Sequence, residues 1–337
     1  MILPDDGPPP AAGHLASDRG GEASAGAGGT GAAPAVPSLP GRAAITRTRG
    51  VNPFDVTVQE GEHYDAVRPS YPEAAVDWVL EGLEAPLDVV DLGAGTGLFT
   101  RLLTARPVEE VGSVVAVEPS AAMRAVLARD VADAPGPVSD TPGPVPDTPG
   151  PASAAPRRAA GRVSGPGPTG RIRALPGTAE ATGLAEAGAD VVVAAQAWHW
   201  VDVPAASAEA ARVLRPGGRL AAVWNQLDTT VPWVHRLTRI MHAGDVHAAA
   251  PQQRRFAAPF GPEEHARWSW STDLTPAQLH GLMASRSYWL RAKEPTRERM
   301  TANLRWYLHE HLGHAEEAVL TVPYLTVAWR ARRPRRR

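Results

Sequence analysis

The chain has 337 residues, a formal net charge of −2 at pH 7, 43% hydrophobic residues and no cysteine. This hydrophobic content is enough for a sizeable core. The lack of cysteine excludes disulfides, thiolate metal sites, iron–sulfur clusters and cysteine nucleophiles. The near-neutral charge predicts no general attraction to nucleic acid. Because the sequence has neither a secretory signal near Met1 nor an apolar run approaching ~20 residues, we expect a soluble, cytoplasmic protein with no membrane partner.

Three segments have compositions that oppose folding. Residues 1–50 consist mainly of Gly, Ala, Pro and Ser and predict a disordered leader. Residues 133–170 repeat Ala-Pro-Gly-Pro and Thr-Pro-Gly-Pro, and prolines at this density oppose helices and sheet ladders. Since α/β patterns flank this second segment, we interpret it as a disordered insert within one domain. The arginine-rich residues 331–337 predict a solvated, disordered basic tail.

Between these segments the chain alternates between helix and strand patterns. A helical pattern begins near Glu73, and the apolar run 87–92 predicts a buried strand that ends in a glycine-rich turn. Further strands are expected at 114–118, 171–175, 190–194 and 219–224, helices after Gly97, after Ser120 and over 204–214, and a turn at 215–218. Repeated βα units of this kind predict a doubly wound, mainly parallel sheet.

The remainder, residues 227–330, is expected to form a C-terminal helical cap and two closing strands. Residues 265–271 alternate with Trp268 and Trp270 on one side, and 319–329 form a β-branched and aromatic run. Residues 276–311 between them have a helical pattern. The complete prediction is an α/β fold with a seven-stranded sheet, in which residues 51–226 form the ligand-binding core.

The glycine-rich turn after the first strand is the strongest ligand-binding signal. In a doubly wound sheet, ligands bind beyond the carboxyl ends of the strands, where strand order reverses. Gly93, Ala94, Gly95 and Gly97 lie there, and glycines let a ligand approach the backbone closely. A nucleoside triphosphate site would need Lys and Ser or Thr after the last glycine. A dinucleotide site would need glycine at Leu98, which disfavours NAD or FAD and leaves it as an alternative.

Acidic residues near the turn favour a cationic ligand without phosphate. Asp91, two residues before Gly93, suits an ammonium group and would repel a pyrophosphate. Glu118, at the end of the second strand, suits the two hydroxyls of a ribose. Glu180, which follows Ala179 after the third strand, suits an adenine amine. Alternatively, Asp91 orders the turn, and both glutamates are solvated strand ends.

At this point a family resemblance is evident. Residues 89–97, Val-Val-Asp-Leu-Gly-Ala-Gly-Thr-Gly, resemble the first motif of class I S-adenosylmethionine-dependent methyltransferases, and Glu118-Pro119-Ser120 with Met123 resembles the second. Residues 212–218 resemble the turn before the family's fifth strand. Residues 64–72 and 196–200 are similar to segments of the small-molecule branch that includes trans-aconitate methyltransferase. The insert is the main departure from the family pattern.

The resemblance implies a Rossmann-like methyltransferase fold, S-adenosyl-L-methionine as cofactor and a small-molecule acceptor. It also implies that Tyr64 and Arg68 approach the methionine carboxylate, that Met123 contacts the adenine, and that Gln196 lies at the methionine end of the cofactor. The residues carry no signal for an oligomeric state.

His199, after the fourth strand, is the candidate catalytic base for a hydroxyl or amine acceptor. The alternative is a positioning residue between two packed tryptophans, Trp198 and Trp200. No residue pattern predicts a metal site, and the His309/His311 spacing alone does not make one. A nucleic-acid methyltransferase would have an Asn/Asp-Pro-Pro-aromatic stretch at 196–200, which is absent. A non-catalytic S-adenosylmethionine-binding or regulatory protein and, less favoured, an NAD-dependent oxidoreductase remain as alternatives.

Overall fold

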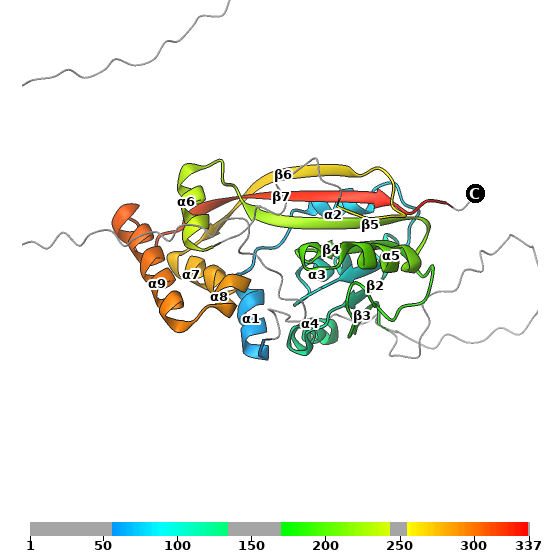
Figure 1. Cartoon of the computed structure of the whole chain (residues 1–337), viewed down its shortest axis with the longest axis horizontal. Coiled ribbons are helices and arrows are strands. Elements are labelled where there is room, and N and C mark those ends of the chain that lie inside the picture. The colour runs from blue at the N-terminus through cyan, green and yellow to red at the C-terminus, as the bar shows by residue number, and fades with distance from the viewer. Residues whose placement is uncertain (1–55, 134–169, 243–254, 336–337) are drawn as a thin grey trace, which may run out of the picture. The chain divides into compact units, whose positions relative to one another are not determined.

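The structure, a computed structural model, describes residues 56–133, 170–242 and 255–335 (Figure 1). The predicted leader and residues 134–169 of the predicted insert lie outside these ranges. The insert would connect helix α4 (Ala121–Asp133) with strand β3 (Ile172–Leu175), which are separate elements of the same domain.

A seven-stranded mixed sheet organises the described chain. Its strands lie in the order β3-β2-β1-β4-β5-β7-β6. The first five of these pair in parallel, whereas β7 pairs antiparallel with both β5 and β6. The remaining strand bounds are Leu87–Leu92 for β1, Val111–Val117 for β2, Ala189–Ala195 for β4, Leu214–Leu227 for β5, Glu264–Leu274 for β6 and Leu320–Arg332 for β7. This confirms the predicted doubly wound α/β fold, and strand order reverses beside β1.

The helices divide between the sheet and a C-terminal cap. Around the parallel strands lie α2 (Glu73–Leu80), α3 (Leu98–Thr104), α4 and α5 (Val203–Val213), with a short 3-10 helix, η2, at Trp198–Trp200. The cap contains α6 (Pro232–Ile240), α7 (Pro276–Ala284), α8 (Ser287–Arg291), α9 (Glu294–Arg305) and a π-helical turn, η4, at Trp306–His311. In Figure 1, α7 and α8 lie beside the N-terminal helix α1 (Val58–Val67).

Helix α1 precedes the first helix expected from the sequence. Only Gly61 of its ten residues is buried, so the helix has no apolar periodicity to reveal it. Its local signal is a capping box, in which Thr57 and Glu60 exchange hydrogen bonds with each other's backbone. The first helix therefore begins before the helical pattern expected near Glu73, inside the core predicted to start at residue 51.

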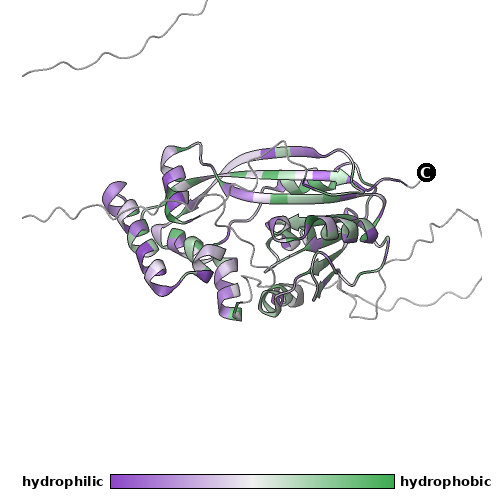
Figure 2. Ribbon diagram, in the orientation of Figure 1, coloured by the Kyte–Doolittle hydropathy of each residue, from purple (hydrophilic) through white to green (hydrophobic). Residues whose placement is uncertain are grey.

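Alternate residues of the parallel strands form two apolar layers, one on each face of the sheet. Val90, Val115 and Val192 belong to one layer, while Val89, Val114 and Val191 belong to the other. This period-two division is what a strand buried on both faces requires. A third cluster fills the cap, whose helix α9 is coloured mainly hydrophilic in Figure 2.

Two local expectations are corrected at the amino edge of the sheet. The turn predicted at 215–218 lies inside β5, where the pairing with β4 jumps from Leu214 to Arg219 and Gly217 takes a φ of +86°. The predicted disordered tail is instead packed here as far as it is described. Strand β7 continues to Arg332, and the Arg333 amide donates to the Gly218 carbonyl over 2.7 Å.

Candidate active site

The glycine turn leaves β1 at its carboxyl end in a left-handed conformation. Gly93, Gly95 and Gly97 have φ values of +65°, +58° and +94°, which residues with a Cβ adopt only at a cost of roughly 1–2 kcal/mol. A Cβ on Gly93 would lie 2.6 Å from the Cβ of Ala197, whereas a Cβ on Gly95 would meet nothing within 4 Å. The turn is therefore packed against the segment after β4 at Gly93 and open at Gly95.

Asp91 is fully buried immediately before this turn. Its Oδ2 accepts a 2.7 Å hydrogen bond from Thr100 Oγ1 on α3, while Oδ1 has no hydrogen-bond partner among the described residues. Burial, with a smaller contribution from the negative charge of Glu118, raises the pKa of Asp91 to about 7. An unpaired buried carboxylate oxygen is unusual in a native protein, and a cationic ligand group would satisfy it.

Glu118 lies at the end of β2 on the other side of the turn. Its Oε2 accepts from the Gly95 amide over 3.0 Å, and its Oε1 accepts from the Ser120 amide over 2.8 Å. Burial raises the pKa of Glu118, although these two hydrogen bonds oppose the shift. The predicted association of Asp91 and Glu118 around the glycine turn is therefore present in the structure.

The end of α1 is held against the same turn. Asp65 forms a 2.6 Å ion pair with Arg101, whose guanidinium also donates to the Thr96 carbonyl. Arg68 follows α1, and its guanidinium carbon lies 4.8 Å from the centre of the Tyr64 ring. Arg68 also donates to Ser285 of the cap through Nε, over 2.9 Å to Oγ, and through a terminal nitrogen, over 3.1 Å to the carbonyl. The end of α1 thus connects the turn, through Asp65 and Arg101, with the cap, through Arg68.

Tyr71 is a residue of this region that the sequence analysis missed. Its ring packs edge-on against Phe99 with centroids 5.2 Å apart, and the side chain is buried. Burial raises its pKa, and the charges of Tyr64 and Asp91 add to the shift while Arg68 opposes it. Tyr71 thus packs on α3, the helix whose Thr100 is hydrogen-bonded to Asp91. Its position in a Ser-Tyr-Pro sequence gave no chemical signal.

Gln196 follows β4 in a strained conformation. Its φ is +54°, an arrangement that costs of order 1–3 kcal/mol in a non-glycine residue and tends to mark functional sites. The Gln196 amide donates to the Val223 carbonyl over 2.8 Å, and its Nε2 donates to the Asn225 carbonyl over 2.5 Å. Both acceptors lie in β5, so the sheet itself holds Gln196 beside the glycine turn.

His199 is partly buried in η2 and contacts two tryptophans. Nε1 of Trp224 donates to Nδ1 of His199 over 3.2 Å, and the Trp200 ring lies 4.9 Å from the imidazole. Trp198 is a core residue, whereas Trp200 is 38% exposed. The Arg291 guanidinium of α8 lies 5.9 Å from the Trp200 ring centre. The cap therefore reaches the segment that carries His199.

The remaining predicted residues have different surroundings. Met123 is buried on α4, where its sulfur lies 3.7 Å from the position of a Cβ on Gly61. Ala179 is buried in the apolar layer that contains Val117. Glu180 accepts a 2.8 Å hydrogen bond from the Asp202 amide at the start of α5. The negative charge of Glu118 therefore acts on Asp91, whereas the Glu180 carboxylate is hydrogen-bonded to the start of α5.

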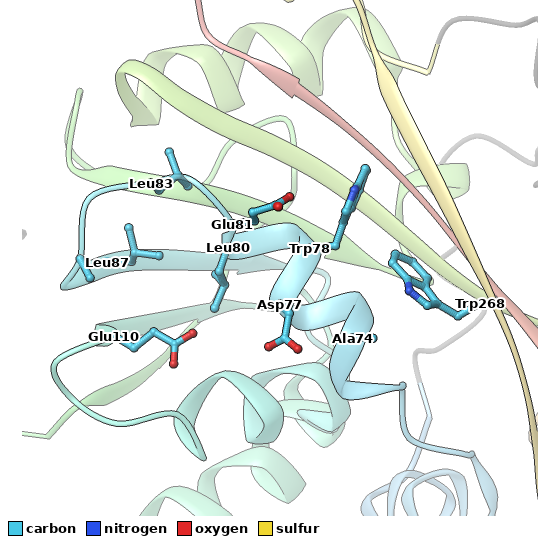
Figure 3. Close-up of a pocket in the computed structure, with 10 residues that line it drawn as sticks. Ala74, Asp77, Trp78, Leu80, Glu81, Leu83, Leu87, Glu110 and Trp268 are labelled. Atoms are coloured by element: carbon cyan, nitrogen blue, oxygen red, sulfur yellow. The ribbon is translucent and has the colours of Figure 1, made fainter.

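A surface hollow of about 500 Å³ lies elsewhere, on α2. Figure 3 shows Trp78 and Trp268 at one side of it and Leu83 and Leu87 at the other. Leu87 begins β1, so the hollow faces the amino edge of the sheet. Its carboxylates are paired with arginines: Asp77 with Arg106 over 2.7 Å and Glu81 with Arg330 over 3.1 Å. The hollow is therefore separate from the glycine turn.

Comparisons with known proteins assign the chain to a family. A family model for the methyltransferase domain matches residues 150–222. Uncharacterized methyltransferases from Mycobacterium tuberculosis and Mycobacterium bovis are each 37% identical over 271 residues, which cover 80% of this chain and 91% of each relative. The chain belongs to the class I S-adenosylmethionine-dependent methyltransferases. An uncharacterized methyltransferase-like protein from Schizosaccharomyces pombe is 28% identical to this methyltransferase over 249 residues, 72% of this chain and 81% of the relative.

The cofactor of this methyltransferase is S-adenosyl-L-methionine, and the described residues fit it. Asp91 offers a buried carboxylate oxygen in need of a partner, Gly95 leaves open space, and Glu118 provides a second carboxylate. Within residues 56–133, 170–242 and 255–335, no cluster of side chains is suited to a metal ion. No helix in these ranges is both long and apolar enough to cross a membrane.

Proposed function

We propose that this methyltransferase methylates a hydroxyl, amine or carboxyl group of a small-molecule acceptor by in-line displacement. The observation that supports a small acceptor is the contact between the cap and the cofactor-binding segments. Arg68 is hydrogen-bonded to Ser285 of the cap, and Arg291 of the cap lies over Trp200. An acceptor bound between cap and sheet would be enclosed, which suits a metabolite better than a nucleic-acid duplex.

The proposed cofactor site divides into two ends. At the methionine end, Asp91 receives the ammonium group, Tyr64 and Arg68 approach the carboxylate, and Gln196 completes the site. At the nucleoside end, Glu118 accepts the ribose hydroxyls, and the adenine is contacted by Met123, Ala179 and Glu180. Gly93, Ala94, Gly95 and Gly97 provide the backbone surface between the two ends. The pairing of a cationic group with Asp91 is favoured by the absence of another partner for its Oδ1 among the described residues.

The protein's own contribution to the reaction is positioning and exclusion of water. When bound, the cofactor supplies a methyl group that is already activated on a sulfonium. The residues must therefore hold the acceptor in line with that methyl group, and no covalent enzyme intermediate is required. Trp200 and the cap would shield the reacting groups from water, and a carboxylate acceptor would need no base.

For a hydroxyl or amine acceptor, His199 is the residue proposed to contact the reacting group. An indole N–H can only donate, so Nδ1 of His199 must accept the bond from Trp224. A neutral imidazole in this arrangement carries its proton on Nε2. We therefore propose that His199 orients a hydroxyl acceptor by donating from Nε2 to one lone pair of its oxygen, while the other lone pair attacks the methyl group and the hydroxyl proton leaves to solvent. Action as a base through Nδ1 would require the bond from Trp224 to break.

The decisive experiment has two parts. Calorimetry should show binding of S-adenosylmethionine and no comparable binding of NAD. Full-length protein is then incubated with methyl-labelled cofactor and a metabolite extract, in parallel with nucleic acid and with protein fractions. We expect label in small molecules, and the label should survive nuclease and protease treatment. Label found only in a macromolecular fraction would refute a small acceptor, and cofactor binding without transfer into any fraction would favour a non-catalytic binder.

A further inference from the structure

We propose that Asn225 is a positioning residue for the methionine end of the cofactor, acting through the segment between α1 and α2. Asn225 lies near the carboxyl end of β5, is 7% exposed and was not singled out by the sequence analysis. This inference rests on the proposed cofactor site. It adds a hydrogen-bond network that connects that site with the antiparallel strands β6 and β7.

Asn225 is the last side chain in a partly buried series of three hydrogen bonds. Trp270 Nε1 on β6 donates to Thr326 Oγ1 on β7 over 2.8 Å, and Thr326 Oγ1 donates to Asn225 Oδ1 over 2.6 Å. Asn225 Nδ2 then donates to the Ser70 carbonyl over 2.9 Å. Thr326 is fully buried and is the direct cross-strand partner of Asn225.

The direction of these three hydrogen bonds follows from which groups can donate and which can accept. An indole nitrogen can only donate, so the Thr326 oxygen accepts from Trp270 and turns its own proton toward Asn225. The side-chain oxygen of Asn225 must then face Thr326, and the amide nitrogen must face Ser70. The Ser70 carbonyl therefore receives a donor whose orientation is set from two strands away.

The anchored segment carries the residues of the proposed methionine end. Ser70 lies between Arg68 and Tyr71, and the charges of both Arg68 and Asp91 act on the Tyr71 hydroxyl. The backbone carbonyl of Asn225 also accepts the 2.5 Å hydrogen bond from Gln196. One residue thus holds the 68–71 segment with its side chain and Gln196 with its backbone. Among the described residues, no hydrogen bond joins this network to Glu118 at the proposed nucleoside end.

The test compares two ligands that differ at the methionine end. S-adenosylmethionine has the complete amino-acid group, whereas 5′-methylthioadenosine lacks it and retains the nucleoside. In Asn225→Asp, an oxygen replaces the donor that faces the Ser70 carbonyl. We expect calorimetry on the full chain to show a dissociation constant for S-adenosylmethionine raised roughly tenfold. The constant for methylthioadenosine should change by less than about twofold.

A second pair of variants tests the network without altering Asn225. Thr326→Val removes the hydroxyl and should raise the S-adenosylmethionine constant roughly threefold, while Thr326→Ser keeps the hydroxyl and should restore most of the affinity. Val111→Ala serves as a matched control, because it truncates a fully buried side chain at the amino end of β2. This control should lower the unfolding temperature and leave the ratio of the two dissociation constants unchanged.

The outcomes separate a positioning role from a merely structural one. Selective loss of S-adenosylmethionine affinity in Asn225→Asp and in Thr326→Val, with recovery in Thr326→Ser, supports the proposal. Equal weakening of both ligands, or unchanged affinity for both in folded variants, overturns it. If Asn225→Asp does not fold, the two Thr326 variants decide between these results. Failure of the wild-type chain to bind S-adenosylmethionine would instead refute the proposed cofactor site.

Discussion

Trp224 donates a hydrogen bond to Nδ1 of His199 over 3.2 Å, and this bond determines which imidazole nitrogen carries the proton. Trp224 itself is buried and packs edge-on against Trp329 of β7, with ring centroids 5.5 Å apart. The donor is therefore held by the sheet, while His199 lies in the short helix after β4. A fixed donor at Nδ1 makes the neutral imidazole a donor at Nε2.

Nitrogen–proton correlation spectra of the eleven histidines should contain a neutral ring with the proton on Nε2 that disappears in His199→Gln. Trp224→Phe removes the donor and should shift the same ring toward a mixture of tautomers. A proton on Nδ1 of His199 in the wild-type protein would contradict the proposed role.

Asp91 should make the ligand-free protein less stable as the pH rises. Its pKa is raised from 3.8 to about 7 because burial disfavours the carboxylate. Below pH 3.8 both folded and unfolded chains hold the proton. Between 3.8 and 7 only the folded chain does, so the unfolding free energy falls with rising pH, and above pH 7 the loss is complete. The full loss is about 4 kcal/mol at most.

Urea unfolding between pH 4 and 8 tests this expectation with Asp91→Asn. The variant should be more stable than wild type at pH 8, and the difference should shrink toward pH 4. Glu316→Gln, which removes an exposed carboxylate from the cap, should show no such pH-dependent difference. A constant difference between Asp91→Asn and wild type at every pH would show that the titration of Asp91 is not its cause.

The same carboxylate should couple cofactor binding to proton release. An ammonium group paired with Oδ1 favours the ionised form, so binding below about pH 7 must expel a proton from Asp91. The affinity for S-adenosylmethionine should therefore decrease as the pH falls from 7 to 5. Calorimetry in two buffers with different ionisation enthalpies measures the released proton directly. Asp91→Asn should bind more weakly and release none, whereas an unchanged proton count in this variant would point to another group.

The parts of the fold and site that the sequence predicted are those with local, repetitive signals. Apolar runs such as 87–92 correctly identified the parallel strands, and the glycines with Asp91 and Glu118 correctly identified the carboxyl edge of the sheet. Helix α1 was missed because it buries only Gly61 and is held by single contacts such as the Asp65–Arg101 ion pair. A capping box was its one usable signal.

The contacts that the sequence did not predict join distant segments. Ser285 is hydrogen-bonded to Arg68, which lies 217 residues away in the sequence, and Asn225 is hydrogen-bonded to Ser70, which lies 155 residues away. No local pattern encodes such pairs. Asn225 did carry a weak signal, since it is a polar residue near the carboxyl end of a buried parallel strand, where ligand-binding residues of this fold class gather. The prediction of a disordered tail was wrong for the described residues, because a high charge density does not reveal that the end of β7 pairs with β5.

Ser285 should link the stability of the cap to cofactor affinity. Ser285→Ala removes the side-chain acceptor of Arg68 and retains the 3.1 Å bond to the Ser285 carbonyl. We expect a loss of about 1 kcal/mol in unfolding free energy and a rise of roughly threefold in the dissociation constant of S-adenosylmethionine. Ser287→Ala, two residues further, is the matched control. A stability loss without any change in affinity would show that Arg68 does not act at the cofactor site.

The glycine turn allows backbone strain to be separated from ligand contact. Gly95→Ala and Gly313→Ala place a Cβ at similar φ values, +58° and +74°, and neither Cβ meets an atom within 4 Å. Both variants should lose roughly 1–2 kcal/mol of stability. Only Gly95→Ala should also weaken S-adenosylmethionine binding, by tenfold or more as a rough estimate, because its Cβ would occupy the space where the cofactor approaches the backbone.

Gly93→Ala should behave differently, since its Cβ would lie 2.6 Å from that of Ala197 and would force β1 and the Gln196 segment apart. We expect it to be the least stable of the three variants. Calorimetry and thermal unfolding on all three then distinguish the causes. Equal affinities in Gly95→Ala and Gly313→Ala would mean that the open side of the turn does not face the cofactor, and the site would have to lie elsewhere along the carboxyl edge of the sheet.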